Sequence, residues 1–134
     1  MRVMIDTNIL ISMLLFPSKK YDDFFEIING EHTLVLSSFV IDEFWDVIKR
    51  KFPQKEEAAD TFLTKLAYEL AYTPHQMPGN LFEIRDMKDY PVVYSGIIDG
   101  SDILISGDKD IAAVEIDAPE IMTMADFMRI CQMF

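Results

Sequence analysis

The stretch MRVMIDTNIL, residues 1–10, carries the pattern that decides the fold class. Residues 2–5 form a short apolar run that is too short for a helix and ends at the acidic residue Asp6. Directly after it, apolar residues recur with the spacing of one helix face, at Ile9, Leu10, Met13 and Leu14. A buried strand followed at once by a helix predicts one unit of an α/β fold.

The same alternation continues along the chain. Apolar runs predict further strands at residues 33–36, 81–84, 103–106 and 121–122. Helical spacing and capping residues predict further helices at residues 18–29, 38–51, 54–72, 89–99 and 124–132. The one clear loop, residues 73–80, is too short to link two domains, so we expect a single domain over residues 1–134. Strands separated by helices predict a three-layer α/β sandwich with a central, mostly parallel sheet.

The composition is that of a packed globular chain. Of the 134 residues, 50% are hydrophobic, which excludes a disordered segment. The single cysteine, Cys131, cannot form an internal disulfide, and this fits a reducing cytoplasm. Asp6 interrupts the N-terminus too early for a signal peptide, and no apolar run approaches the roughly 18 residues of a membrane span. We therefore expect a cytoplasmic protein with no membrane partner.

Acidic residues outnumber basic ones by 23 to 12, for a formal net charge of −11. This excess argues against a protein that coats nucleic acids in general, because phosphate affinity comes mainly from Lys and Arg. Solubility accounts for most of the acidic residues. Four of them, however, stand where solubility would not place them.

These four acids are expected at one edge of the sheet. Asp6 and Asp108 each follow an apolar strand, and α/β folds place their sites at the carboxyl ends of parallel strands. Glu43 lies at the margin of the apolar stripe of its helix, where a carboxylate is costly unless a cation or donor meets it. Asp89 begins the helix that contains Pro91, so it is either an ordinary N-cap or a member of the site.

Converging carboxylates constrain the chemistry. Without a counter-charge they repel one another, so an acidic pocket at neutral pH calls for a cation. Neither cysteine nor histidine stands beside them in the sequence, and an all-oxygen ligand set selects Mg²⁺ or Mn²⁺. Such an ion activates a bound water and neutralises charge that develops on a phosphate. The pattern therefore predicts phosphodiester hydrolysis.

Several motifs together resemble the PIN-domain ribonucleases, a family that includes the VapC-like toxins of toxin–antitoxin pairs. The matching elements are the DTN of residues 6–8, Glu43 in a helix that follows Ser37 or Ser38, RDMKDYPVVYSGIIDGSDILISGDKDI at 85–111 and IMTMADFM at 121–128. The resemblance covers nearly the whole chain. It implies a PIN-like fold and a Mg²⁺- or Mn²⁺-dependent endonuclease that cleaves single-stranded RNA. It also implies a homodimer and inhibition by a small antitoxin protein.

The resemblance also implies roles for individual residues. The catalytic and metal-binding acids fall on Asp6, Glu43, Asp89 and Asp108, with Asp110 as a further ligand or support. Asp86 and Asp102 are close enough in sequence to compete for these roles, and whether Asp86 or Asp89 is the third ligand stays open. Asn8 and Ser106 are expected to orient carboxylates. Lys109, Lys49 and Arg50 are candidate RNA contacts, although Lys49 and Arg50 also suit an ordinary helix C-terminus.

A second hypothesis is a non-catalytic interaction module that keeps the PIN-like fold without turnover. Two observations motivate it. Tyr94 and Gly96 stand where the family tends to have small alanines, and the acid excess is unfavourable for RNA. The many large apolar residues leave some for a partner, either a second copy of the chain or an antitoxin.

Overall fold

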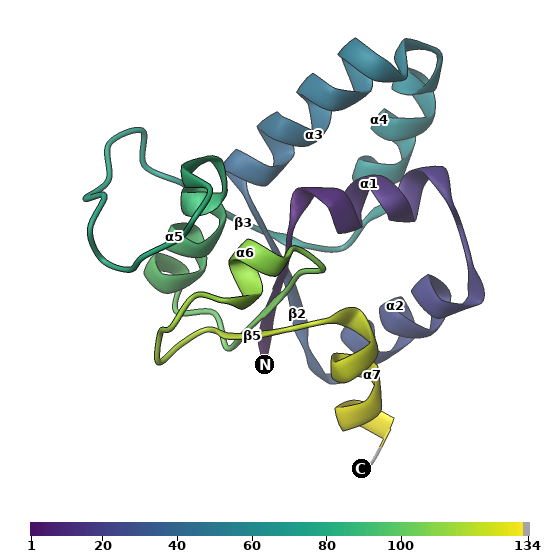
Figure 1. Ribbon diagram of the computed structural model, residues 1–134. Helices are drawn as coiled ribbons and strands as arrows, with labels where there is room; N and C mark the ends of the chain where they lie inside the picture. Colours follow the sequence, from purple (N-terminus) through teal and green to yellow (C-terminus); the bar gives the residue numbers. More distant parts are fainter. Residues whose placement is uncertain (133–134) are drawn as a thin grey trace.

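A five-stranded parallel sheet forms the centre of the computed structural model, which describes residues 1–132 (Figure 1). Its strands are β1 (Arg2–Ile5), β2 (Thr33–Ser37), β3 (Glu69–Ala71), β4 (Ile103–Ile105) and β5 (Glu120–Met122). Their order across the sheet is β3-β2-β1-β4-β5, and every neighbouring pair is parallel. The central strands β1 and β4 are almost wholly buried, because helices cover both faces of the sheet.

The strands are connected by helices, as the alternating pattern predicts. These are α1 (Thr7–Leu15), α2 (Lys19–Glu31), α3 (Ser38–Lys51), α4 (Glu56–Lys65), α5 (Tyr90–Asp99), α6 (Lys109–Ala112) and α7 (Met124–Gln132). Short 3-10 turns precede two of them, η1 (Pro53–Lys55) and η2 (Met87–Asp89). The sheet separates α5 from α1, α2 and α7 (Figure 1). The predicted three-layer α/β sandwich with a parallel sheet is thus confirmed.

Local sequence explains where the main helices begin. Ser37 is the N-cap of α3, and its hydroxyl accepts a hydrogen bond from the backbone N–H of Val40. Thr123 accepts a hydrogen bond from the N–H of Asp126 at the start of α7. Gly100 ends α5 with a left-handed φ of 72°, a conformation that a residue with a side chain rarely adopts.

The predicted helix over residues 54–72 is wrong in its second half. Helix α4 ends at Lys65, and β3 follows it as an edge strand that pairs with β2. Residues 67–71 contain good helix formers, but pairing with β2 overrides that weak preference. Leu70 is 62% exposed although it is apolar, so β3 lacks the alternation of buried apolar and exposed polar residues by which a strand is usually recognised.

Two smaller predictions also differ from the structure. Residues 81–84 form no strand, and their apolar side chains anchor a loop instead, because the ring of Phe82 stacks on Tyr90 with centroids 4.3 Å apart. Gly30 does not end the second helix, which continues to Glu31. The four-residue helix α6 has no sequence periodicity and was not predicted.

This topology brings the carboxyl ends of β1, β2 and β4 to one edge of the sheet. Asp6 follows β1, α3 follows β2 and the segment leading into α6 follows β4. The opposite edge is held by Arg2, whose guanidinium bonds to Asp99 and Glu69. None of the helices within residues 1–132 combines the length and apolar character needed to cross a membrane.

Candidate active site

Asp6 is a buried carboxylate at the end of β1, only 4% exposed. Its Oδ1 accepts a hydrogen bond from the N–H of Ile9 at 3.0 Å and so caps α1, while its Oδ2 accepts one from the hydroxyl of Ser106. Burial nevertheless raises the pKa of Asp6, and the charges of Asp108 and Glu43 raise it further. The side chain is therefore fixed in direction, and no Lys or Arg of residues 1–132 forms an ion pair with it.

Ser106 connects Asp6 to the next acid of this edge. Besides donating to Asp6, its hydroxyl accepts a hydrogen bond of 3.0 Å from the N–H of Asp108. Asp108 is the N-cap of α6, where its Oδ1 accepts from the N–H groups of Asp110 and Ile111 at 2.7 and 3.2 Å. Two strand ends and one short helix thus hold both carboxylates in a single hydrogen-bonded unit.

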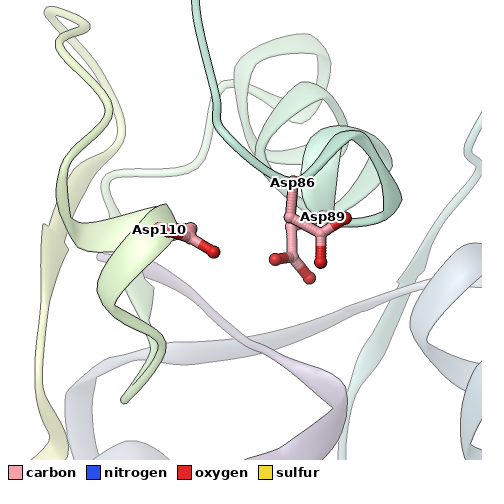
Figure 2. A group of neighbouring side chains, drawn as sticks. All are labelled: Asp86, Asp89 and Asp110. Carbon is pink, nitrogen blue, oxygen red and sulfur yellow. The ribbon is translucent and has the colours of Figure 1, made fainter.

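Within residues 1–132, Asp86, Asp89 and Asp110 form a group of converging acids (Figure 2). One carboxylate oxygen of each lies within 4.8 Å of the others. Asp86 caps the η2 turn through a 3.0 Å bond from the N–H of Lys88. Asp89 occupies the N-cap position of α5, but its side chain makes no capping hydrogen bond. The ordinary capping role therefore does not account for Asp89.

Asp89 is also the acid whose titration is most strongly displaced. Partial burial raises its pKa from 3.8 to about 6, and the charges of Asp108, Asp86, Glu43 and Asp110 add to the shift. The half-buried Glu43 on α3 thus acts on both Asp6 and Asp89. Carboxylates from four separate parts of the chain repel one another at this edge.

Cations are scarce near these acids. Within residues 1–132 the only ion pair that involves them joins Arg85 to Asp110. No Lys or Arg pairs with Asp6, Glu43 or Asp89 in that part of the chain. A set of oxygen donors whose repulsion one guanidinium relieves only in part fits a hard divalent cation such as Mg²⁺ or Mn²⁺.

The carboxylates predicted as metal ligands do not all lie equally close to one another. No three of the predicted acids Asp6, Glu43, Asp89 and Asp108 bring their oxygens within 4.8 Å of one another in residues 1–132, whereas Asp86 and Asp110 do so with Asp89. Asp102 was expected to compete as a ligand, and the structure places it elsewhere. It lies at the opposite edge of the sheet, where its carboxylate accepts a 2.8 Å bond from the N–H of Arg2.

The polar and basic candidates are divided between two places. A pocket beside Asp6 is lined by Asn8, Asp108 and Lys109, among others, so these residues lie at the acidic edge of the sheet. Lys49 and Arg50 instead lie in the last turn of α3, whose first turns carry Glu43. Arg50 pairs there with Asp46 at 3.4 Å.

One residue that organises this edge has no signal in the sequence. Thr73, buried at the end of β3, accepts a hydrogen bond from the N–H of Phe39 at 3.3 Å, and its hydroxyl lies 2.7 Å from that of Ser95. Its own N–H donates to the hydroxyl of Ser38 at 2.8 Å. Thr73 therefore joins α3, which carries Glu43, to α5, which follows Asp89.

The packing of α5 explains the unusual small residue in it. A Cβ added to Gly96 would lie 2.9 Å from Cγ of Pro119, so the close approach of α5 to the segment before β5 requires glycine. Tyr94 stacks against Tyr90, with ring centroids 6.0 Å apart. These residues thus support the helix rather than disturb the placement of Asp89.

Comparison with known proteins assigns the family. The model of the PIN domain family matches residues 2–110. A solved chain of similar fold belongs to the crystal structure of VapBC2 from Rickettsia felis bound to a DNA fragment from their promoter. It is 18% identical, with a TM-score of 0.68 over 91% of this chain and 97% of that one. No curated protein sequence matches this chain. Because the family model spans most of its length, the chain belongs to the PIN domain family.

Proposed function

We propose that this protein is a metal-dependent endoribonuclease that hydrolyses phosphodiester bonds of single-stranded RNA. The observation that carries the proposal is the acidic edge, where carboxylates after β1 and from α3, η2 and α6 repel one another, and where within residues 1–132 only Arg85 pairs with one of them. Membership of the PIN domain family supports it, because the nucleases of that family use divalent ions held by acids.

Asp6, Glu43, Asp89 and Asp108 would hold Mg²⁺ or Mn²⁺, with Asp86 and Asp110 as further ligands. The bound ion would activate water and offset charge on the phosphate. Ser106 keeps the Asp6 carboxylate in one orientation, and the N–H groups at the start of α6 do the same for Asp108. Asn8 would support these ligands, and Lys109 would contact a phosphate beside them.

We propose in addition that a small antitoxin protein inhibits this cytoplasmic enzyme and that it acts as a homodimer. The shared fold with VapBC2 supports a partner of this kind. Large apolar side chains that remain exposed could form such interfaces, among them Phe16, Leu70, Tyr72 and Met87. Lys49 and Arg50 lie away from the acids, so any contact they make with RNA is with a remote part of the strand.

The test is cleavage of a labelled single-stranded RNA by the purified chain with Mn²⁺ or Mg²⁺, and with EDTA. We expect ion-dependent internal cleavage by the natural sequence and a loss of about 100-fold or more in Asp6→Asn. Asp46→Asn is the matched control, since Asp46 is an exposed acid outside the site. Equal cleavage by Asp6→Asn and the natural sequence refutes the proposal. The absence of both cleavage and Mn²⁺ binding would favour the non-catalytic interaction module, which has no need to hold the ion.

A further inference from the structure

Arg85 makes a two-pronged contact with one acid of the candidate site. Its Nε donates to Oδ1 of Asp110 at 2.7 Å, and its Nη2 donates to Oδ2 at 2.8 Å. Both carboxylate oxygens thus face the guanidinium, which is the fork geometry that arginine favours. Asp110 therefore already has a cation on it in this structure.

The same carboxylate belongs to the group that would hold a divalent ion. Asp110 extends from α6 toward Asp86 and Asp89, which lie across a narrow gap (Figure 2). The charge of Arg85 also interacts with Asp86 and Asp108. Asp110 consequently pairs with the guanidinium of Arg85 and also lies within the group of acids that would hold the ion.

The two partners differ in how firmly they are held. The side chain of Arg85 is 82% exposed, whereas that of Asp110 is 20% exposed and lies on α6. Because Arg85 is so exposed, its guanidinium can leave Asp110 for solvent without breaking a buried contact. The loss in stability is small, since an exposed ion pair contributes little. A doubly charged ion that contacts several acids can therefore displace it.

We infer that Arg85 is a built-in counter-cation that competes with the divalent ion for Asp110. The inference rests on the proposed function and adds a residue that sets the affinity of its ion site. With no ion bound, Arg85 relieves part of the repulsion among the acids. The arriving ion takes over the oxygens of Asp110, and the freed guanidinium is then a positive group beside the site.

The competition predicts that removing Arg85 tightens binding of the ion. Mn²⁺ titrated calorimetrically into the EDTA-treated, dialysed full chain should bind Arg85→Gln about three- to tenfold more tightly than the natural sequence. Arg129→Gln is the matched control, because Arg129 also pairs with an aspartate, Asp126, but belongs to α7 and has no role in the site. Its affinity for Mn²⁺ should equal that of the natural sequence.

A second substitution locates the effect at Asp110. In Asp110→Asn, which removes the shared charge, the additional change Arg85→Gln should alter Mn²⁺ affinity much less than it does in the natural sequence. Diamagnetic Mg²⁺ should also shift the NMR signal of the Arg85 Nε–H, which reports its bond to Asp110. Neither readout depends on RNA cleavage.

The outcomes separate the inference from the proposed function. Equal or weaker Mn²⁺ binding by Arg85→Gln overturns the competition and leaves the ion site standing. The competition is also overturned if Arg85→Gln raises Mn²⁺ affinity by the same factor in Asp110→Asn as in the natural sequence. The effect would then come from the charge of Arg85 acting on the whole site and not from its bond to Asp110. No Mn²⁺ binding by the natural sequence refutes the ion site itself, and the inference falls with it.

Discussion

Asp89 reports on the electrostatics of the acidic edge more directly than any other single residue. Its pKa of about 6 lies above the ordinary 3.8, so the folded state holds the proton more tightly than the unfolded chain. As the pH rises through this range the carboxylate becomes charged, and without an ion it opposes folding. The cost is fully present above pH 6 and absent well below pH 4.

The substitution Asp89→Asn should therefore stabilise the ion-free fold at pH 7.5. After allowance for solvent screening the expected gain is about 1 kcal/mol in the free energy of unfolding, measured by urea denaturation in EDTA. The difference from the natural sequence should shrink as the pH falls below 4, where Asp89 becomes protonated in both the folded and the unfolded state. With saturating Mn²⁺ the natural sequence should become the more stable of the two, since the ion stabilises only the chain that binds it. Lower stability of Asp89→Asn in EDTA at pH 7.5 would contradict this explanation.

Candidate site residues could be predicted where an acid stands at or just after the end of an apolar strand. Asp6 and Asp108 are of this kind, because strand ends fix their edge of the sheet whatever the details of the loops. The resemblance names Asp89 and Asp110 as ligands and Asp86 as an alternative to Asp89, but that these three would converge could not be predicted. It depends on the path of the preceding loop and on α6, whose four residues show no periodicity.

At the scale of elements, the acids are positioned by the contact between α3 and α5. Thr73 lies between these helices and bonds to the start of α3 and to Ser95 of α5. A change at Thr73 should consequently shift Glu43 relative to Asp89 although neither residue is altered. This is a positioning role and involves no contact with the ion.

Thr73→Val keeps the shape of the side chain and removes its hydroxyl. The N–H of Phe39 then loses its partner, and we expect a loss of about 1–2 kcal/mol in the free energy of unfolding. Mn²⁺ affinity should also fall, which calorimetry would show. Thr64→Val, on the exposed face of α4, is the matched control. If Thr73→Val behaves like that control in both measurements, the positioning role is wrong.

Most elements could be predicted from sequence because apolar periodicity and capping residues agree in them. The exception is the segment after α4, where helix-forming residues belong to the edge strand β3. An edge strand gains its stability from pairing with β2, a long-range contact that local propensity does not contain. The loop that contains Phe82 could not be predicted either, because the stacking of Phe82 on Tyr90 is a tertiary contact that local propensity does not contain.

At the scale of the whole molecule, the two edges of the sheet differ in their electrostatics. The edge that carries the acids is electrostatically strained, whereas the opposite edge is held by favourable pairs. There Arg2 of β1 donates to both oxygens of Asp99 at 3.1 and 2.8 Å and also bonds to Glu69 of β3. The contacts tie the centre of the sheet to its outer strand and to the end of α5.

Arg2→Gln should separate stability from ion binding. We expect a loss of about 1–2 kcal/mol in the free energy of unfolding, because Asp99 is mostly buried and loses its cation. Mn²⁺ affinity should stay that of the natural sequence, since this edge lies across the sheet from the acids. Urea denaturation and calorimetric titration measure the two quantities. A parallel fall in Mn²⁺ affinity would show that the edges are coupled.

We expect acids distant in the chain to hold a divalent ion at the carboxyl edge of the sheet. Anomalous X-ray scattering from crystals of the full chain grown with Mn²⁺ would locate this ion. We expect an anomalous peak in contact with Asp89 and with at least one of Asp6 and Asp108. Saturating Mn²⁺ that gives no peak at this edge, or a peak only elsewhere on the molecule, would contradict it.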